Sequence, residues 1–344
     1  MSEVRTTIKD IAARTNLSVT TVSLVLNDKP SKISKKTKEL VLKTALELQY
    51  RPNQLAVGLI KKRTQTIGLI VPDIRNSFFS TLAKGIEDEC RKSGWTVILC
   101  NTSDIHERDI EYINVLASKG VDGILYCMSA DSSLEKFQKS YDLLNMLNIP
   151  FIMLDRSFQM PNCIAAKLDH VTGGYLATKH LLDLGHKRIA CVTGPKNLDD
   201  SNCRLEGYKK ALQDGGIAYD ESIIVEGNYG TNSGITAVEL LMDKSFTAIF
   251  AFNDMMAYGV YNGLKAHDLS VPADISVMGY DDIFLSEILE VPLSTVHQPV
   301  GRMGAAATRH LIGIIDHNLE NEVIATFPPK LIVRKSTALC KPPR

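Results

Sequence analysis

The sequence predicts a small all-α helix-turn-helix headpiece followed by an α/β core of two doubly wound parallel-sheet lobes. Three observations lead to this fold class. The start of the chain is basic and holds closely spaced helix start signals, short apolar runs alternate with helical stretches from residue 66 onward, and that alternation comes in two successive series. A chain of 344 residues with 44% hydrophobic content can bury the cores of two or three domains without disulfides.

The balance of charge differs between the start of the chain and the rest. The whole sequence has 39 Lys and Arg against 39 Asp and Glu, but residues 1–63 hold thirteen of the basic and five of the acidic residues. The first segment therefore has a net charge of +8 and the remainder a net charge of −8. Such asymmetry indicates that the basic segment meets a polyanion, although a solvated basic face is the alternative on charge alone.

Three short helices are expected in the basic segment. Thr7, with an acid three positions on, begins a variant of the capping box, and Asn16 suits a left-handed turn after the first helix. Ser18 can cap a second helix over residues 19–26, and Ser34 can cap a third. Two short helices joined by a tight turn and followed by a supporting helix form the helix-turn-helix pattern.

The rest of the chain alternates strands with helices at the spacing of parallel sheets. The expected strands cover residues 67–71, 95–100, 121–127, 149–154, 188–194, 223–225, 248–252 and 275–279. The first four belong to one series and the last four to a second, which predicts two similar lobes. Ligands of such open sheets bind beyond the carboxyl ends of the strands.

Polar and aromatic residues follow these strands where a ligand would bind. Carboxylates and amides accept hydrogen bonds from hydroxyl groups, guanidinium groups donate them, and aromatic faces cover the C–H surface of a sugar. Any single one of these residues is as readily explained as a helix cap. As a set they predict a site for vicinal hydroxyls, and the residues concerned are Asp73, Asn76, Phe78, Phe79, Asp155, Arg156, Arg204, Asn253, Asp254, Asp281, Asp282 and Gln298.

Other classes of protein find little support in the sequence. There is no apolar run of the roughly 18–20 residues that span a bilayer, and no signal peptide. The seven Cys are an odd number without a CxxC pair, which argues for a reducing cytoplasm and against a zinc ribbon. No nucleotide-binding, protease, hydrolase or kinase motif occurs. We expect a cytoplasmic, nucleoid-associated protein that is not an enzyme and has no catalytic residue, metal, cofactor or membrane partner.

The segments TIKDIAARTNLSVTTVSLVLN and YRPNQLAVGL resemble the headpiece of the LacI–GalR family of bacterial transcription regulators. The resemblance implies that Val19 and Thr20 face base edges in the major groove, where Thr20 can hydrogen-bond and Val19 offers apolar contact. Ser18, Thr21 and Ser23 would hold phosphates. The DNA-binding residues so implied are Thr7, Ser18, Val19, Thr20, Thr21, Ser23, Leu24, Asn27, Tyr50, Asn53, Leu55, Ala56 and Leu59.

Residues 52–59 would form a hinge helix by the same resemblance. Eight residues that include Gly58 are too short to hold a helix on a free chain, so we expect it to form only when two copies meet over DNA. Leu59 would wedge between base pairs from the minor groove and kink the duplex, while Leu55 and Ala56 line the groove contact. A plain linker is the alternative.

Residues 64–338 resemble the periplasmic sugar-binding fold that the family uses as its regulatory core. The resemblance within that fold is to the ribose-binding proteins, and Tyr229 falls near one of their ribose-contacting positions. Nine residues each fall on such a position: Asn76, Phe78, Phe79, Asp155, Arg156, Arg204, Asn253, Asp281 and Gln298. The implied domains are a headpiece over residues 1–51, a hinge and linker over 52–63, and an effector-binding and dimerisation core over 64–344. The N-lobe would take residues 64–166 and 299–328, and the C-lobe residues 167–296 and 329–344.

The resemblance implies a homodimeric repressor that binds a pseudopalindromic operator in double-stranded DNA. A small sugar, ribose or a related pentose, would bind between the lobes and control operator affinity by moving the hinges. Two alternatives have the same DNA-binding headpiece but a different effector. One is a catabolite-control regulator driven by a phosphocarrier protein, and the other is a purine-type repressor that needs its corepressor. A sugar-binding protein or enzyme that merely uses this core is a third.

Overall fold

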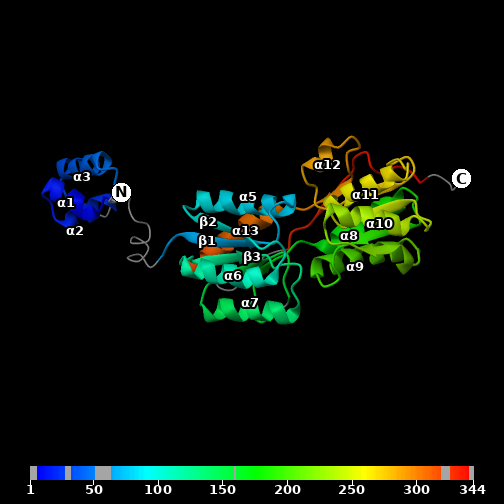
Figure 1. The fold of residues 1–344 in the computed structure, drawn as a ribbon, viewed down its shortest axis with the longest axis horizontal. Coiled ribbons are helices and arrows are strands. Elements are labelled where there is room, and N and C mark those ends of the chain that lie inside the picture. The colour runs from blue at the N-terminus through cyan, green and yellow to red at the C-terminus, as the bar shows by residue number, and fades with distance from the viewer. Residues whose placement is uncertain (1–5, 28–31, 51–62, 159, 319–325, 341–344) are drawn as a thin grey trace. The chain divides into compact units, whose positions relative to one another are not determined.

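The chain folds into two compact units, Met1–Thr64 and Gln65–Arg344. A computed structural model describes residues 6–27, 32–50, 63–158, 160–318 and 326–340. The described part of the first unit consists of α1 (Ile8–Thr15), α2 (Val19–Leu26) and α3 (Lys35–Glu47) (Figure 1).

The three helices of the first unit pack around a small apolar core. Ile11, Val22 and Val41, one from each helix, are fully buried at its centre. Each predicted cap is in place, because the Ser18 hydroxyl accepts a hydrogen bond from the backbone of α2 and the Ser34 hydroxyl accepts one from the backbone of α3. The second helix occupies the residues that the sequence predicts for it.

The second unit contains two parallel sheets with the same strand order. The first sheet runs β2-β1-β3-β4-β5 and the second runs β7-β6-β8-β9, so in both the order reverses beside the first strand of the series. The strands are β1 (Thr66–Val71), β2 (Thr96–Asn101), β3 (Gly123–Tyr126), β4 (Phe151–Leu154), β5 (Ala165–Ala166), β6 (Ile189–Thr193), β7 (Ile224–Glu226), β8 (Ala248–Ala251) and β9 (Ser276–Met278). The predicted doubly wound, two-lobed core is confirmed.

Helices cover both sheets in packed pairs. In the first lobe α5 packs on α13 and α6 on α7; in the second lobe α8 packs on α9 and α10 on α11 (Figure 1). The helices are α5 (Ser77–Lys92), α6 (His106–Ser118), α7 (Leu134–Met146), α8 (His170–Asp183), α9 (Asp199–Asp214), α10 (Thr231–Leu241), α11 (Asp254–Ala266), α12 (Leu285–Ile288) and α13 (Val300–Ile315), with a 3₁₀ turn over Glu221–Ile223.

The C-terminal part of the chain contributes elements to both lobes. Although α13 comes late in the sequence, it packs against β3, β4 and β5 of the first lobe. The short strands β10 (Thr295–His297) and β11 (Lys330–Ile332), on either side of α13, pair antiparallel and contact α8 of the second lobe. The chain therefore passes between the lobes more than once, which is the geometry of a hinge made of several segments.

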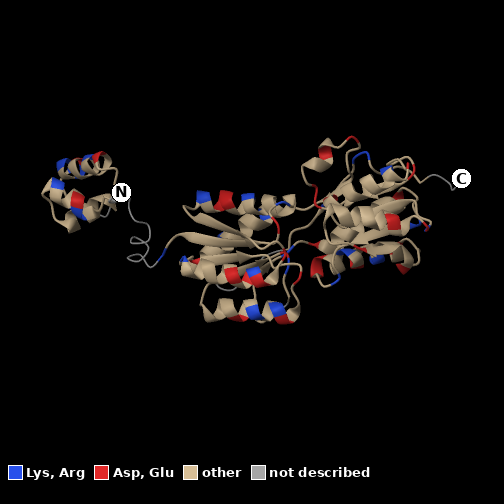
Figure 2. Cartoon of the chain, in the orientation of Figure 1, with Lys and Arg blue, Asp and Glu red and all other residues tan. Residues whose placement is uncertain are grey.

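The strands are apolar because helices bury both faces of each sheet. β1, β3, β4, β6 and β8 contain no charged residue, and Figure 2 shows the charged residues on helices and loops. The sequence did not predict the strands β5, β10 and β11, which have two or three residues each. The equally short β7 and β9 were predicted because they follow helical stretches in the second strand–helix series.

Candidate functional site

A cavity between the two lobes brings together residues from the carboxyl ends of both sheets. Its lining is Asn76, Phe78, Phe79, Asp155, Arg156, Asp200, Arg204, Tyr229, Asn253 and Asp281. Nine of these ten are among the residues predicted from the sequence. The tenth predicted residue, Gln298, lies directly behind, where its Nε2 donates to Asp281 Oδ1 at 2.7 Å.

Arg156 enters the cavity from the end of β4 in the first lobe. Its Nη1 donates to Asp104 Oδ1 at 3.0 Å, and its guanidinium lies 5.2 Å from the ring centroid of Phe79 and 5.5 Å from that of Tyr229. Burial acts to lower the pKa of Arg156, but the charges of Asp104 and Asp200 outweigh it and raise the pKa. The side chain is a permanently charged donor held against two aromatic rings.

Arg204 enters from α9 in the second lobe and is more tightly held. Its Nη1 donates to the carbonyl of Phe252, its guanidinium lies 4.1 Å from the ring centroid of Tyr280, and its Nη2 lies 3.7 Å from Asp200 Oδ2. The helix can take this position because α8 comes very close: a Cβ on Gly174 would lie 2.2 Å from the carbonyl oxygen of Arg204. A glycine is thus required where the two helices cross.

His170 links Arg204 to Asp155. Arg204 Nε donates to His170 Nδ1 at 3.3 Å, and His170 Nε2 lies 2.8 Å from Asp155 Oδ1. Because a guanidinium can only donate, Nδ1 accepts and the ring hydrogen sits on Nε2, which donates to Asp155. Asp155, at the end of β4, has a φ of 57°, a left-handed conformation uncommon outside glycine. This turn points its carboxylate toward the second lobe.

Two buried oxygens of the site have no hydrogen-bond donor among the described residues. They are Asp200 Oδ1 and Gln298 Oε1. The other Asp200 oxygen accepts from the Tyr229 hydroxyl at 2.6 Å. A buried acceptor without a donor is costly, and because Asp200 lines the cavity, its Oδ1 can take a hydrogen bond from a bound molecule.

The carboxylates of the site differ in their electrostatic surroundings. Burial acts to raise the pKa of Asp200, but Arg204 and Arg156 lower it below its ordinary value, so this group is ionised at neutral pH. Burial raises the pKa of Asp281 well above its ordinary value, with the charge of Arg204 acting in the opposite direction. Asp281 is therefore the carboxyl group of this cavity that most readily takes up a proton.

Four residues that build the site were missed from the sequence. Asp200 precedes Arg204 by four positions on the same helix, and this spacing of opposite charges could have revealed it. His170, Tyr280 and Asp104 have no such local signal, because each meets its partner through the tertiary fold.

The first unit has the geometry of a helix-turn-helix. Asn16 ends α1 in the left-handed region with φ 56°, as predicted. Val19 and Thr20, at the start of α2, are exposed, and Val19 has 43% of its surface accessible. Ser18 is exposed too, and its hydroxyl lies 2.8 Å from that of Thr21 and accepts the Thr21 backbone amide at 3.0 Å. The start of α2 therefore presents side chains to a partner.

The remaining predicted DNA-binding residues of this unit lie around these helices. The backbone amide and hydroxyl of Thr7 both donate to one oxygen of Asp10 at 2.7 Å, and Asn27 Nδ2 donates to the carbonyl of Ser23 at 2.8 Å. Leu24 and Tyr50 are half-buried. The predicted hinge residues Asn53, Leu55, Ala56 and Leu59 lie outside the described residues.

Within residues 6–27 and 32–50, most basic side chains have no ion pair with a carboxylate of the same ranges. The one ion pair in these ranges joins Lys43 to Glu47 at 4.0 Å. Lys35, Lys36 and Lys38, at the start of α3, have no carboxylate partner in those ranges. Figure 2 shows basic residues on α3. Basic side chains without a carboxylate partner are available to bind the phosphates of a nucleic acid backbone.

The described ranges offer no sign of two other kinds of site. None of their helices has the length and apolar character needed to cross a bilayer. No cluster of three or more His, Cys, Asp or Glu in those ranges is arranged to hold a metal ion.

A helix-turn-helix unit and a two-lobed polar cavity in one chain define a ligand-responsive DNA-binding regulator. Family models agree: residues 7–53 match the bacterial regulatory proteins of the lacI family, and residues 64–333 match the periplasmic binding proteins and sugar binding domain of the LacI family. The chain belongs to the LacI family. It is a DNA-binding repressor with a sugar-binding domain, and its relatives are transcription regulators rather than enzymes.

Three similar proteins place the chain within this family. The HTH-type transcriptional repressor PurR of Vibrio atlanticus is 40% identical over 96% of this chain and 98% of its own length. A lac repressor dimer bound to operator and the anti-inducer ONPF has a TM-score of 0.85 at 29% identity, covering 97% of this chain and all of that one. A LacI family regulator from Enterococcus faecium with bound ribose has a TM-score of 0.73 at 36% identity, covering 80% of this chain and all of that one.

Proposed function

We propose that this repressor acts as a homodimer whose operator affinity is controlled by ribose or a related pentose bound in the cavity between the lobes. The cavity residues and Gln298 would contact the sugar. Val19 and Thr20 would read base edges, with Ser18, Thr21 and Ser23 on phosphates. The proposed domains are a headpiece over residues 1–51, a hinge over 52–63 and a core over 64–344.

The observation that carries the choice of a sugar is the buried acceptor Asp200 Oδ1, which has no donor, in a cavity with two fixed guanidinium groups and with a second such acceptor, Gln298 Oε1, on the residue that backs Asp281. Hydroxyl groups can donate to Asp200 Oδ1 and accept from Arg156 and Arg204 at once. The charge of the cavity also favours a sugar. Its carboxylates and guanidinium groups largely neutralise one another, and a neutral polyol leaves that balance of charge unchanged. The regulator from Enterococcus faecium that holds ribose supports the same reading at 36% identity.

A second candidate is a purine-type repressor that binds DNA together with its corepressor. The relatives named PurR favour it, at 35–40% identity. A planar base needs an open aromatic face on which to stack. In this cavity the guanidinium of Arg156 lies over Phe79 and Tyr229, and that of Arg204 lies over Tyr229 as well, so among the lining rings Phe78 is the one without a guanidinium over it. A single ring face is enough for the C–H surface of a pentose, whereas a purine stacks over a larger area. We therefore rank the pentose first.

The proposed mechanism is linkage between the cavity and the hinge. A sugar that holds both lobes favours the closed core, changes the distance between the two hinge segments of a dimer, and weakens operator binding. A change of about 100-fold in DNA affinity requires about 2.7 kcal/mol of differential binding, which a few charge-assisted hydrogen bonds can supply.

A ligand panel tests the proposal. Full-length protein is titrated in a calorimeter with D-ribose, other pentoses, hexoses, adenine, guanine, hypoxanthine and a phosphorylated phosphocarrier protein. We expect heat with D-ribose or another pentose, and loss of that heat in Arg204→Ala. Heat with a purine base and none with any sugar would replace the first candidate by the second. Heat with the phosphocarrier protein instead would favour the catabolite-control alternative.

A further inference from the structure

We propose that Asn197 and the loop over residues 128–133 form a closure latch between the lobes, outside the cavity, and that Asp104 ties this latch to Arg156. The latch itself is argued from contacts between the lobes. Its influence on effector affinity rests on the function proposed above, and the test separates the two.

The latch consists of two hydrogen bonds that cross from one lobe to the other. Asn197 lies in the second lobe between β6 and α9, and its Nδ2 donates to the carbonyl oxygens of Ala130 at 2.7 Å and Ser132 at 3.0 Å. Both acceptors follow β3 of the first lobe. Asn197 is exposed and does not line the cavity, so its bonds report closure of the lobes rather than contact with a ligand.

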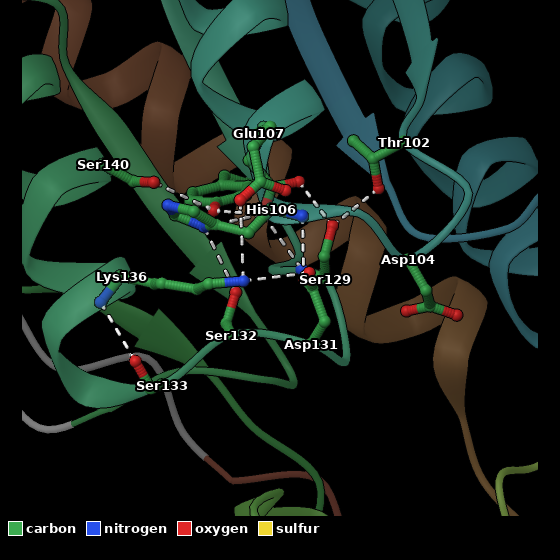
Figure 3. A network of polar contacts seen from close by, with 12 residues as sticks. Thr102, Asp104, His106, Glu107, Ser129, Asp131, Ser132, Ser133, Lys136 and Ser140 are labelled. Atoms are coloured by element: carbon green, nitrogen blue, oxygen red, sulfur yellow. Dashed lines mark hydrogen bonds and ion pairs between the residues drawn. The ribbon is translucent and has the colours of Figure 1, made fainter.

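The receiving loop is held by hydrogen bonds within its own lobe, and Figure 3 shows this network of polar contacts. Ser129 donates from its hydroxyl to Asp109 Oδ1 at 2.7 Å and from its backbone amide to Asp109 Oδ2 at 3.1 Å. Asp131 Oδ1 accepts the backbone amide of His106 at 2.7 Å. Ser129 and Asp109 are buried and Asp131 is exposed, so the loop is held by a buried pair and by one bond at the surface. The two carbonyls that meet Asn197 are therefore a fixed target.

Asp104 joins this loop to the cavity through a single oxygen. Its Oδ1 accepts the backbone amide of Ala130 at 2.8 Å and Nη1 of Arg156 at 3.0 Å. The residue itself has a φ of 58°, and Ser103 before it has a φ of 57°, so two successive non-glycine residues take the left-handed conformation. A ligand that forms a hydrogen bond with Arg156 therefore also affects, through Asp104, the loop that accepts the hydrogen bonds of Asn197. Asp104 is a positioning residue by this reasoning.

The sharpest probe is Asn197→Asp, which keeps the shape of the side chain and removes both donors. It also sets a carboxylate against two carbonyl oxygens, which repel it. Because Asn197 is an exposed loop residue, the fold should tolerate the change, and Asn197→Ala repeats the loss without added charge. Asn145→Ala is the matched control, since Asn145 Nδ2 donates to a backbone carbonyl, that of Tyr141, within α7 of one lobe.

The first readout is hydrogen exchange of the ligand-free, full-length protein by mass spectrometry. We expect peptides over residues 128–134 and 195–199 to exchange about tenfold faster in both Asn197 variants and at the wild-type rate in Asn145→Ala. Wild-type exchange in both segments of the Asn197 variants would overturn the latch, and so would an equal acceleration in the control.

The second readout is calorimetry with D-ribose, which we expect to bind both Asn197 variants about tenfold more weakly than wild type. Asp104→Asn should weaken ribose binding and also speed exchange over residues 128–134. Faster exchange with an unchanged ribose affinity would overturn the coupling to the effector. If wild-type protein gives no heat with D-ribose or any other pentose, the proposed effector is wrong, and the exchange experiment still decides whether the latch exists.

Discussion

The two lobes of the core share a strand order but hold their polar side chains in different ways. In the second lobe Arg204 is bound by a backbone carbonyl, by a histidine and by a tyrosine ring, all buried. In the first lobe Arg156 has one ion pair, with Asp104, whose side chain is 40% exposed, and otherwise lies over the rings of Phe79 and Tyr229. The second lobe is thus the preorganised half of the cavity. The first lobe supplies the half whose arginine can move when a ligand binds.

The largest expected effect comes from breaking the preorganised half. Arg204→Ala leaves Asp200 buried with a weaker counter-charge, and we expect it to cost about 3–5 kcal/mol of unfolding free energy. Arg156→Ala should cost less, because water can reach the Asp104 carboxylate that it leaves. Urea denaturation of both variants gives the comparison. Equal losses would show that the lobes do not differ as described.

The second effect concerns the buried Asp254 beneath the second lobe's site. Burial raises the pKa of Asp254 to about 6, against the hydrogen bonds from Ser286 and Thr295 that lower it. The folded state therefore holds this proton more tightly than the unfolded chain does. The stability it contributes is present near pH 4 and is lost as pH rises toward 6, by at most about 3 kcal/mol. Melting curves of wild type and Asp254→Asn across this range should differ in slope, and parallel curves would contradict the assignment.

The third effect concerns the helix crossing that positions Arg204. Gly174→Ala puts a methyl group where the carbonyl oxygen of Arg204 lies 2.2 Å away, and we expect it to cost about 1–3 kcal/mol and to weaken effector binding. Gly301→Ala is the control, because the nearest atom to its added Cβ lies 3.9 Å away. Thermal melts and calorimetry measure both. A Gly174 variant as stable as the Gly301 variant would mean that the two helices separate easily.

The smallest effect lies in the headpiece, which is a separate unit. Ser18→Ala removes the cap of α2 and should cost about 1 kcal/mol, in the headpiece alone. Hydrogen exchange should accelerate in α2 and stay unchanged in α9 of the second lobe. Operator binding should weaken while effector affinity stays the same. An altered effector affinity would mean that the two units are coupled in the absence of DNA.

The sequence predicted correctly those features that depend on residues close to one another along the chain. Helix caps such as Ser18 and Ser34 and the αL turn at Asn16 are signals within a few residues, and all three are where they were expected. Residues after strands, such as Arg156 and Asn253, could also be found, because parallel strands bring their carboxyl ends to one edge.

The rest of the site could not be read from the sequence because its partners are far apart along the chain. His170 meets Asp155 across fifteen positions and Asp104 meets Arg156 across fifty-two, through helix packing that no local pattern encodes. The latch is the extreme case, since Asn197 meets Ala130 across sixty-seven positions and two lobes. The choice between a pentose and a purine depends on how the guanidinium groups lie over the rings, which is a property of the folded cavity.

The most direct test of the central claim is operator affinity with and without D-ribose. The protein first selects an operator from random duplexes, and fluorescence anisotropy then measures its affinity for that DNA at fixed salt. We predict that saturating D-ribose weakens binding about 100-fold in wild type and leaves it unchanged in Arg204→Ala. An operator affinity that is the same with and without D-ribose in the wild-type protein would contradict the account.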